Sequence, residues 1–264
     1  MAFSRLNDRV IHWTEAGRPD RPAIVFSNSL GTDFRIWHNV VAHLREHWRI
    51  VLYDKRGHGL SDVPRGPYSI DDHTDDLVAL IDHLGLADVC VVGLSIGGLI
   101  AQNLALRAPH RVKVLVLADT ASKIGTTQGW NERINAVRRG GLAAIADSVM
   151  ERWFTKRFRQ ERPIALAGWR DLLLQCPIEG YVASCAAIRD ADLSSRIAGI
   201  SVPTLAIAGS EDLSTPPDIV QAMADRIPGA RFELVEACGH IPPIEQPAVL
   251  AAAIERHLVE SGHV

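Results

Sequence analysis

The stretch Val91–Gly98, which reads VVGLSIGG, decides the fold of this chain. It matches the pattern Gly-x-Ser-x-Gly, and it joins an apolar, β-branched run to a uniformly apolar stretch. This context predicts a strand that turns sharply into a helix at the serine. Such a turn strains the backbone, and small residues two positions before and after the serine, here Gly93 and Gly97, let strand and helix approach each other. Ser95 is therefore predicted to lie at a helix N-terminus, where backbone N–H groups and the helix dipole favour negative charge.

The sequence on either side of this turn alternates between strand and helix patterns. Short apolar runs between turn signals have the length of strands that are buried on both faces of a parallel sheet. These runs are Ala23–Ser27, Arg49–Tyr53, Val89–Val92, Val112–Leu117, Thr204–Ala208 and Arg231–Val235. Helical patterns lie between or after them, at Asp71–Leu84, Ile96–Arg107, Pro216–Ile227 and Pro247–Val259. The alternation predicts an α/β fold with a mostly parallel central sheet flanked by helices.

The alternation stops between about Ala121 and Arg196. This segment holds three of the six tryptophans and no strand pattern, and its 12 basic against 8 acidic residues give it a formal charge of +4 in a chain of net charge −3. We predict a helical cap at residues 121–196, inserted into a core formed by residues 1–120 and 197–264. The alternative is that these are further core helices with a solvated basic face.

A serine hydroxyl becomes a good nucleophile only when a base takes its proton. His240 is the candidate base, since it follows the last strand run and α/β sheets carry their chemistry at the carboxyl ends of strands. Asp212 follows the preceding strand run and would orient the imidazole and stabilise its cation. The order Ser95, Asp212, His240 is the one expected for a serine on such a turn. Glu211, which is adjacent, and Asp119, at the end of another strand, are alternative acids.

The negative oxygen that forms when a serine attacks a carbonyl needs two N–H donors aimed at it. One is expected from Ile96, the residue after the serine. The other is expected from the loop after Ala23–Ser27, where we select the Leu30 N–H and keep Ser29 as the alternative register.

Composition narrows the classes of protein that are possible. The chain has 264 residues, of which 47% are hydrophobic and 22% charged, as in ordinary globular proteins. Its net charge of −3 gives no reason to expect nucleic-acid or membrane partners. No apolar run approaches the roughly 18–20 residues that span a bilayer, and the N-terminus lacks a secretory signal. The four cysteines form no C-x-x-C pair and the 11 histidines have no ligand spacing, so we expect no disulfide, metal or cofactor, and a cytoplasmic location.

Several motifs resemble the α/β-hydrolase superfamily. They are the turn at Ser95, Asp212–Pro217 (DLSTPP), Gly239–Pro242 (GHIP) and Tyr53–Ser61 (YDKRGHGLS), which resembles a D-x-R-G-x-G-x-S loop that is structural in that superfamily. More narrowly, the chain resembles the 3-oxoadipate enol-lactonases of aromatic catabolism over nearly its whole length. That resemblance lies in Ser27–Thr32 (SNSLGT), Ala121–Thr126 (ASKIGT) with Trp130–Arg133 (WNER), Arg152–Thr155 (RWFT), and Gly180-Tyr181 with Cys185–Asp190 (CAAIRD).

The resemblance implies hydrolysis of a small lactone that carries a free carboxylate, through an acyl-enzyme on Ser95 and without a cofactor. Candidate cations for the carboxylate are Arg133, Arg189 and Lys123, because a guanidinium can bind a carboxylate through two hydrogen bonds. Trp130 and Trp153 are candidate walls of the pocket.

Each of these candidates has an ordinary structural alternative. A cationic side chain can lie on a solvated helix face, and a tryptophan can pack the cap onto the core. Rival functions on the same scaffold are a broad carboxylesterase, a C–C bond hydrolase and a cofactor-free haloperoxidase-like enzyme. A non-catalytic ligand receptor is the alternative of a different class.

Overall fold

The strands form one eight-stranded sheet in a computed structural model that describes residues 1–264. Its order is β1-β2-β4-β3-β5-β6-β7-β8. The strands are β1 (Ala2–Leu6), β2 (Arg9–Gly17), β3 (Ala23–Ser27), β4 (Arg49–Tyr53), β5 (Val89–Leu94), β6 (Val112–Ala118), β7 (Thr204–Gly209) and β8 (Arg231–Val235). The pairs β1–β2 and β2–β4 are antiparallel, and β3 to β8 are parallel. The predicted α/β fold with a mostly parallel sheet is confirmed.

All six predicted strands are present, but they are not equally buried. Every residue of β3, β5 and β7 is buried, as expected for central strands with helices on both faces. In β8 only Val235 is buried, so the interpretation of this run as buried on both faces was wrong. The reason is that β8 has one neighbour only, and its Arg231 and Glu233 pair with each other in solvent.

The antiparallel strands β1 and β2 were not predicted from the sequence. Asn7 and Asp8 join them with φ of 46° and 62°, the left-handed backbone of a tight hairpin turn. β2 then pairs with β4, with Trp13 opposite Tyr53, and extends the sheet at this edge.

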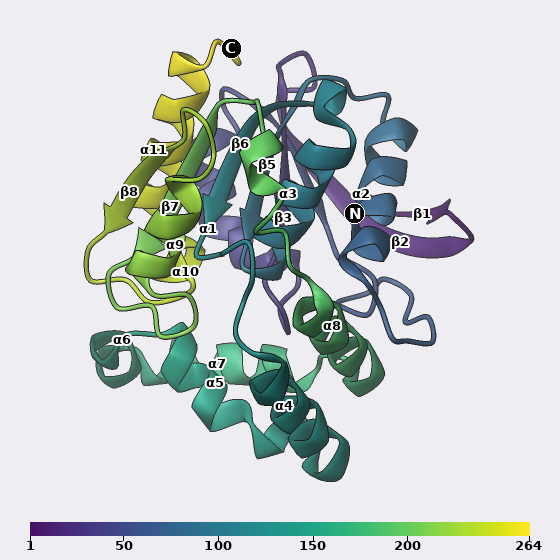
Figure 1. Cartoon of the computed structure of the whole chain (residues 1–264), viewed down its shortest axis with the longest axis vertical. Helices are drawn as coiled ribbons and strands as arrows, with labels where there is room; N and C mark the ends of the chain where they lie inside the picture. The colour runs from purple at the N-terminus through teal and green to yellow at the C-terminus, as the bar shows by residue number, and fades with distance from the viewer.

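Helices cover the sheet on both faces (Figure 1). On one face α3 packs on β5 and β6 and contacts α2, while α1 contacts α11. The helices outside residues 121–196 are α1 (His38–Leu44), α2 (Ile70–His83), α3 (Ile96–Arg107), α9 (Pro217–Ala224), α10 (Pro242–Glu245) and α11 (Pro247–Glu260). Short 3₁₀ turns lie at Phe34–Trp37, Pro109–Arg111 and Ile197–Gly199, and a further one, Leu142–Ala144, lies within residues 121–196. None of the helices combines the length and apolar character needed to cross a membrane.

Residues 121–196 contain helices and no strand. They are α4 (Thr127–Gly140), α5 (Ala146–Trp153), α6 (Lys156–Glu161), α7 (Pro163–Leu174) and α8 (Ile178–Asp190), and they lie together below the sheet in Figure 1. Helix α8 is nearly continuously buried and belongs to the same hydrophobic cluster as the strands. Its Gly180 approaches Gly57 so closely that a Cβ would collide with the Gly57 carbonyl oxygen. These helices are therefore seated on the sheet rather than tethered beside it.

Candidate active site

Ser95 lies at the sharp turn between β5 and α3, as predicted. Its φ of 58° and ψ of −117° are strained for a residue with a side chain. A Cβ on Gly93 would collide with the Gly97 carbonyl, and one on Gly97 would collide with the Ser27 carbonyl. Two hydrogen bonds hold the strained residue: Ser95 N–H donates to Ala118 O at 3.1 Å, and Thr120 Oγ1 donates to Ser95 O at 2.7 Å. The glycines are therefore a steric requirement of the turn.

His240 and Asp212 form a hydrogen-bonded pair in the loops that follow β8 and β7. His240 Nδ1 lies 2.8 Å from Asp212 Oδ2, and both residues are buried. Thr215 Oγ1 donates to the same carboxylate oxygen at 2.7 Å, and Ser214 N–H donates to the other at 2.7 Å. Burial alone would raise the pKa of the Asp212 carboxyl, but His240 and these donors outweigh it and lower that pKa below its usual value. Asp212 is thus an ionised carboxylate that holds the imidazole by its Nδ1 atom.

The two alternative acids occupy different environments. Glu211 is exposed to solvent, next to Asp212 in the chain. Asp119 is fully buried, and its Oδ1 accepts a hydrogen bond from Gly209 N–H at 2.8 Å, while Oδ2 has no partner. Ligand atoms of Asp119, Asp212 and His240 lie within 4.8 Å of one another. Burial and then the charge of Asp212 raise the pKa of the Asp119 carboxyl well above its usual value, which favours its neutral form beside the charged pair.

The two backbone donors selected from the sequence are near the serine. Ile96 is the first residue of α3, so its N–H is among the donors that a helix leaves unpaired at its start. The Leu30 N–H has no partner within the chain, whereas the next N–H, of Gly31, donates to His58 Nε2 at 3.0 Å. Ser29 and Leu30 both line the cavity that contains Ser95.

This cavity has a volume of about 520 Å³ and lies between the strand ends and residues 121–196. Ser95 and His240 line it from the core, and Trp130, Arg133 and Trp153 line it from the other side. Three of the five side chains proposed from the sequence for substrate contact are therefore at the cavity.

The other two candidates, Lys123 and Arg189, do not line this cavity. Lys123 is exposed and pairs with Asp192 at 3.0 Å. Arg189 pairs with Asp190 at 2.8 Å and donates to Asn131, on the wall of a separate surface pocket. The structure corrects the expectation that they face the substrate, because each is engaged by an acidic or amide neighbour on the outside of the helices.

Arg152 is a cavity residue that the sequence-based selection missed. It lines the cavity beside Arg133, and neither guanidinium forms an ion pair with a carboxylate. Partial burial, followed by the like charge of Arg133, lowers the pKa of Arg152, although much of its side chain is exposed to solvent. The only acidic residue of the lining, Glu132, is exposed and accepts a hydrogen bond from Gln128. The sequence signal that could have identified Arg152 is its position next to Trp153 in the RWFT segment.

Arg133 has an aromatic support for its charge. Its guanidinium carbon lies 5.1 Å from the centroid of the Trp130 ring, in a cation–π contact. Two cations without carboxylate partners make the cavity that contains Ser95 attractive to an anion.

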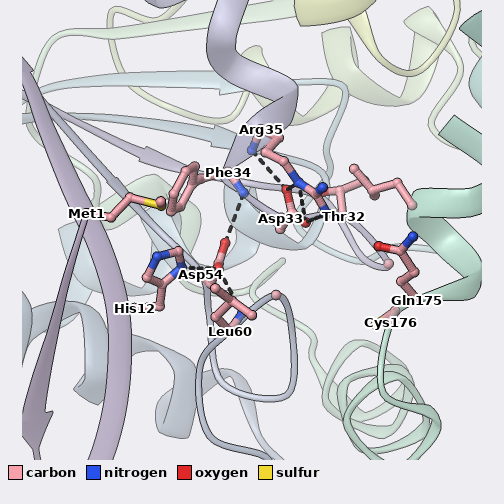
Figure 2. A pocket seen from close by; sticks show the side chains of 13 residues that line it. Met1, His12, Thr32, Asp33, Phe34, Arg35, Asp54, Leu60, Gln175 and Cys176 are labelled. Carbon is pink, nitrogen blue, oxygen red and sulfur yellow. Dashed lines mark hydrogen bonds and ion pairs between the residues drawn. The ribbon is translucent and has the colours of Figure 1, made fainter. Parts of the chain in front are cut away.

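A second cavity of about 400 Å³ lies behind the loop that follows β3 (Figure 2). The Asp54 carboxylate lines this cavity. It accepts hydrogen bonds from Phe34 N–H and Leu60 N–H, both at 3.0 Å, and lies 2.7 Å from His12 Nδ1. None of the candidate catalytic residues lines this cavity. These contacts join the loop after β3 to the loop after β4.

A strained serine on a strand–helix turn, with a histidine–aspartate pair beside one cavity, defines a serine hydrolase architecture. Consistently, residues 24–253 match the model of the alpha/beta hydrolase family, and the chain belongs to that family.

Individual relatives are also similar over almost the entire chain. The chain is 38% identical to 3-oxoadipate enol-lactonase 2 of Acinetobacter baylyi over 248 residues, which is 94% of this chain and 92% of the relative. The crystal structure of the enol-lactonase from Burkholderia xenovorans LB400 superposes with a TM-score of 0.95 and 38% identity, covering 98% of this chain and 100% of the other. A thermophilic esterase from Thermogutta terrifontis, with malate bound, has a TM-score of 0.92 and 27% identity, with 100% and 99% covered.

Proposed function

We propose that this protein hydrolyses 3-oxoadipate enol-lactone to 3-oxoadipate, a step in the catabolism of aromatic compounds. The observation that carries the proposal is one cavity with Ser95 and His240 on one side and two arginines without carboxylate partners on the other. The similarity to two enol-lactonases over at least 94% of the chain supports the choice of substrate.

In the proposed mechanism Ser95 attacks the lactone carbonyl while His240 takes its proton. Asp212 holds the imidazole through Nδ1 and stabilises the cation that forms. The N–H groups of Leu30 and Ile96 bind the developing oxyanion, and each such donor contributes roughly 2.7–4 kcal/mol in other hydrolases. The raised pKa of Asp119 disfavours a second negative charge next to the imidazolium.

As the ring opens, His240 returns the proton to the ring oxygen, which gives an acyl-enzyme on Ser95 whose leaving group, an enol, is still attached to the acyl chain. A tethered alcohol would re-attack and close the ring again. The enol instead tautomerises to a ketone, which removes the competing nucleophile. A water molecule activated by His240 then releases the product, and the step needs no metal or cofactor.

Recognition of the substrate carboxylate is assigned to Arg133 together with Arg152. Charge-assisted hydrogen bonds from a guanidinium are among the strongest polar contacts in proteins, and a planar fork fits a carboxylate. Trp130 and Trp153 supply apolar walls that a five-membered ring can contact.

We further propose that residues 121–196 act as a cap on a core formed by residues 1–120 and 197–264. The cavity lining supports this division, because the core contributes the reacting residues and the cap contributes the cations. The hydrogen bond from His240 N–H to Trp153 O, 2.9 Å, couples the two parts next to the reacting histidine. The four cysteines are free and buried, which fits a reducing cytoplasm.

The proposal is tested by comparing turnover of 3-oxoadipate enol-lactone with turnover of p-nitrophenyl acetate, a neutral ester. We expect the lactone to have the higher kcat/KM by at least about 100-fold, because only the lactone carries the carboxylate that the two arginines bind. If the ester is hydrolysed and the lactone is not, Ser95 remains the proposed nucleophile but the assignment of the substrate is overturned.

A further inference from the structure

Lys55 is a buried cation that the proposed mechanism does not use. It lies in the segment Tyr53–Ser61 after β4, and 1% of its surface is exposed. Its ammonium group forms no ion pair with a carboxylate. Instead, Nζ donates to Ser29 O at 2.6 Å and is 3.4 Å from Thr32 O. Burying a lysine without a carboxylate partner is costly, so its position calls for a reason.

The contact with Ser29 O acts on a single peptide group. The carbonyl of Ser29 and the N–H of Leu30 belong to the same peptide unit, and the only cis peptide bond of the chain is elsewhere, at Gly66-Pro67. In a trans unit the carbonyl and the N–H point in opposite directions. Lys55 therefore binds one end of this unit while the N–H at the other end is free.

A cation at a peptide carbonyl polarises the whole resonance-coupled unit. It draws electron density toward the oxygen, and the opposite N–H becomes a stronger donor, as in other polarised chains of hydrogen bonds. In a dry environment this effect and the direct attraction between an ammonium group and an oxyanion are larger than in water.

Other contacts hold the rest of the same loop. His58 Nε2 accepts from Gly31 N–H at 3.0 Å, and Asn28 Nδ2 lies 3.3 Å from Thr32 Oγ1. Farther along, Asp54 accepts from Phe34 N–H, as Figure 2 shows. The loop is thus fixed on both sides of Leu30. Lys55 is the buried cation that contacts it, whereas Arg35, which pairs with Asp33, is mostly exposed to solvent.

We propose that Lys55 is a positioning residue of the oxyanion site, which holds and polarises the Ser29–Leu30 peptide so that the Leu30 N–H binds the oxyanion more strongly. This inference rests on the proposed function, in which Leu30 supplies one of the two donors. It differs from a structural role because it acts on the transition state and not on substrate binding.

The charge state of Lys55 makes the inference visible in a pH profile. Burial lowers the pKa of Lys55 to about 7, against the opposing effects of Cys176, Asp54 and Asp33. His58 and His73 also face it, and burial lowers the pKa of both well below their usual value, so they are neutral. Lys55 is therefore charged below pH 7 and loses its charge as the pH rises through about 7. We expect kcat to fall on the alkaline side of neutrality.

The test uses the full chain, with p-nitrophenyl acetate as substrate, so that it does not depend on the lactone. In Lys55→Met, which keeps an unbranched side chain but removes the ammonium group, we expect kcat to fall about 10-fold, with KM within two-fold. This is less than the roughly 100-fold loss for a deleted donor. The alkaline fall in kcat should disappear. Inhibition by phenylboronic acid, whose serine adduct is a tetrahedral anion, should weaken by the same factor as kcat.

Lys113→Met, at an exposed lysine on β6, is the matched control and should match wild type throughout. A Lys55→Met enzyme with wild-type kcat would overturn the inference, as would a kcat loss with the alkaline fall retained. If Lys55→Met does not fold, the pH dependence of kcat in wild type still tests the inference. A kcat that is constant from pH 6.5 to 9.5 would overturn it, because it would exclude a titrating Lys55. Failure of the lactone assay with normal ester turnover would instead count against the proposed substrate.

Discussion

Replacing Arg133 with methionine separates recognition of the substrate carboxylate from catalysis at Ser95. Arg133 is half-buried, supported by Trp130 and without an acidic partner, so its charge is available to the substrate. A hydrogen bond to a charged group contributes about 1.5–3 kcal/mol, and 1.4 kcal/mol corresponds to a tenfold change. We therefore expect the KM for the enol-lactone to rise about 10- to 100-fold. Arg152→Met should have a smaller effect, because Arg152 is more exposed to solvent.

The assay is steady-state kinetics of the lactone and of p-nitrophenyl acetate on each variant. The neutral ester should be hydrolysed as by wild type, because it has no carboxylate. Thermal stability should not fall, since removing Arg133 also removes a like charge that lies near Arg152. Arg189→Met, outside the cavity, is the matched control and should leave KM unchanged. The reasoning is refuted if Arg133→Met affects both substrates equally, or leaves the lactone KM within two-fold of wild type.

Three further predictions concern the turn and the buried acids. Gly97→Ala should abolish soluble expression or activity, because its Cβ would collide with the Ser27 carbonyl; a folded enzyme with normal turnover would contradict this. Asp212→Asn should lower kcat about 10⁴-fold, and adding Asp119→Asn should lower it further, because Asp119 would otherwise ionise toward His240; an equal rate in single and double variants would show that Asp119 does not substitute. The difference in melting temperature between Asp119→Asn and wild type should favour the variant more strongly at pH 8 than at pH 4. The pKa of Asp119 is raised in the folded state, so wild type loses stability as the pH rises above the usual pKa of an aspartate, whereas asparagine does not titrate. A difference that is independent of pH would mean that Asp119 is ionised in the fold.

The central sheet was predictable because its strands are continuous apolar runs. The hairpin β1–β2 was missed although Asn7-Asp8 is a turn signal, since β1 alternates exposed and partly buried residues and has no apolar run. The edge strand β8 was found but its burial was misjudged, because sequence alone does not reveal which strand lacks a neighbour.

The candidate site likewise contains residues that could be selected from the sequence and residues that could not. Ser95, Asp212 and His240 could be selected because a turn pattern and strand order fix their positions along the chain. Side chains on the cap helices could not, because helical sequence does not specify which face meets the cavity. Arg189 and Lys123 have acidic neighbours in sequence or space that engage them, and no local signal distinguishes them from Arg133.

The most direct test of the account is the rate of enol-lactone hydrolysis by wild type and by Ser95→Ala, measured on folded, purified protein. We expect rapid turnover by wild type and a loss of about 10⁶-fold in kcat in the variant, as for nucleophile removal in other serine hydrolases. Rapid turnover by Ser95→Ala would contradict it, because another group would then attack the lactone. No turnover by wild type would contradict the proposed substrate.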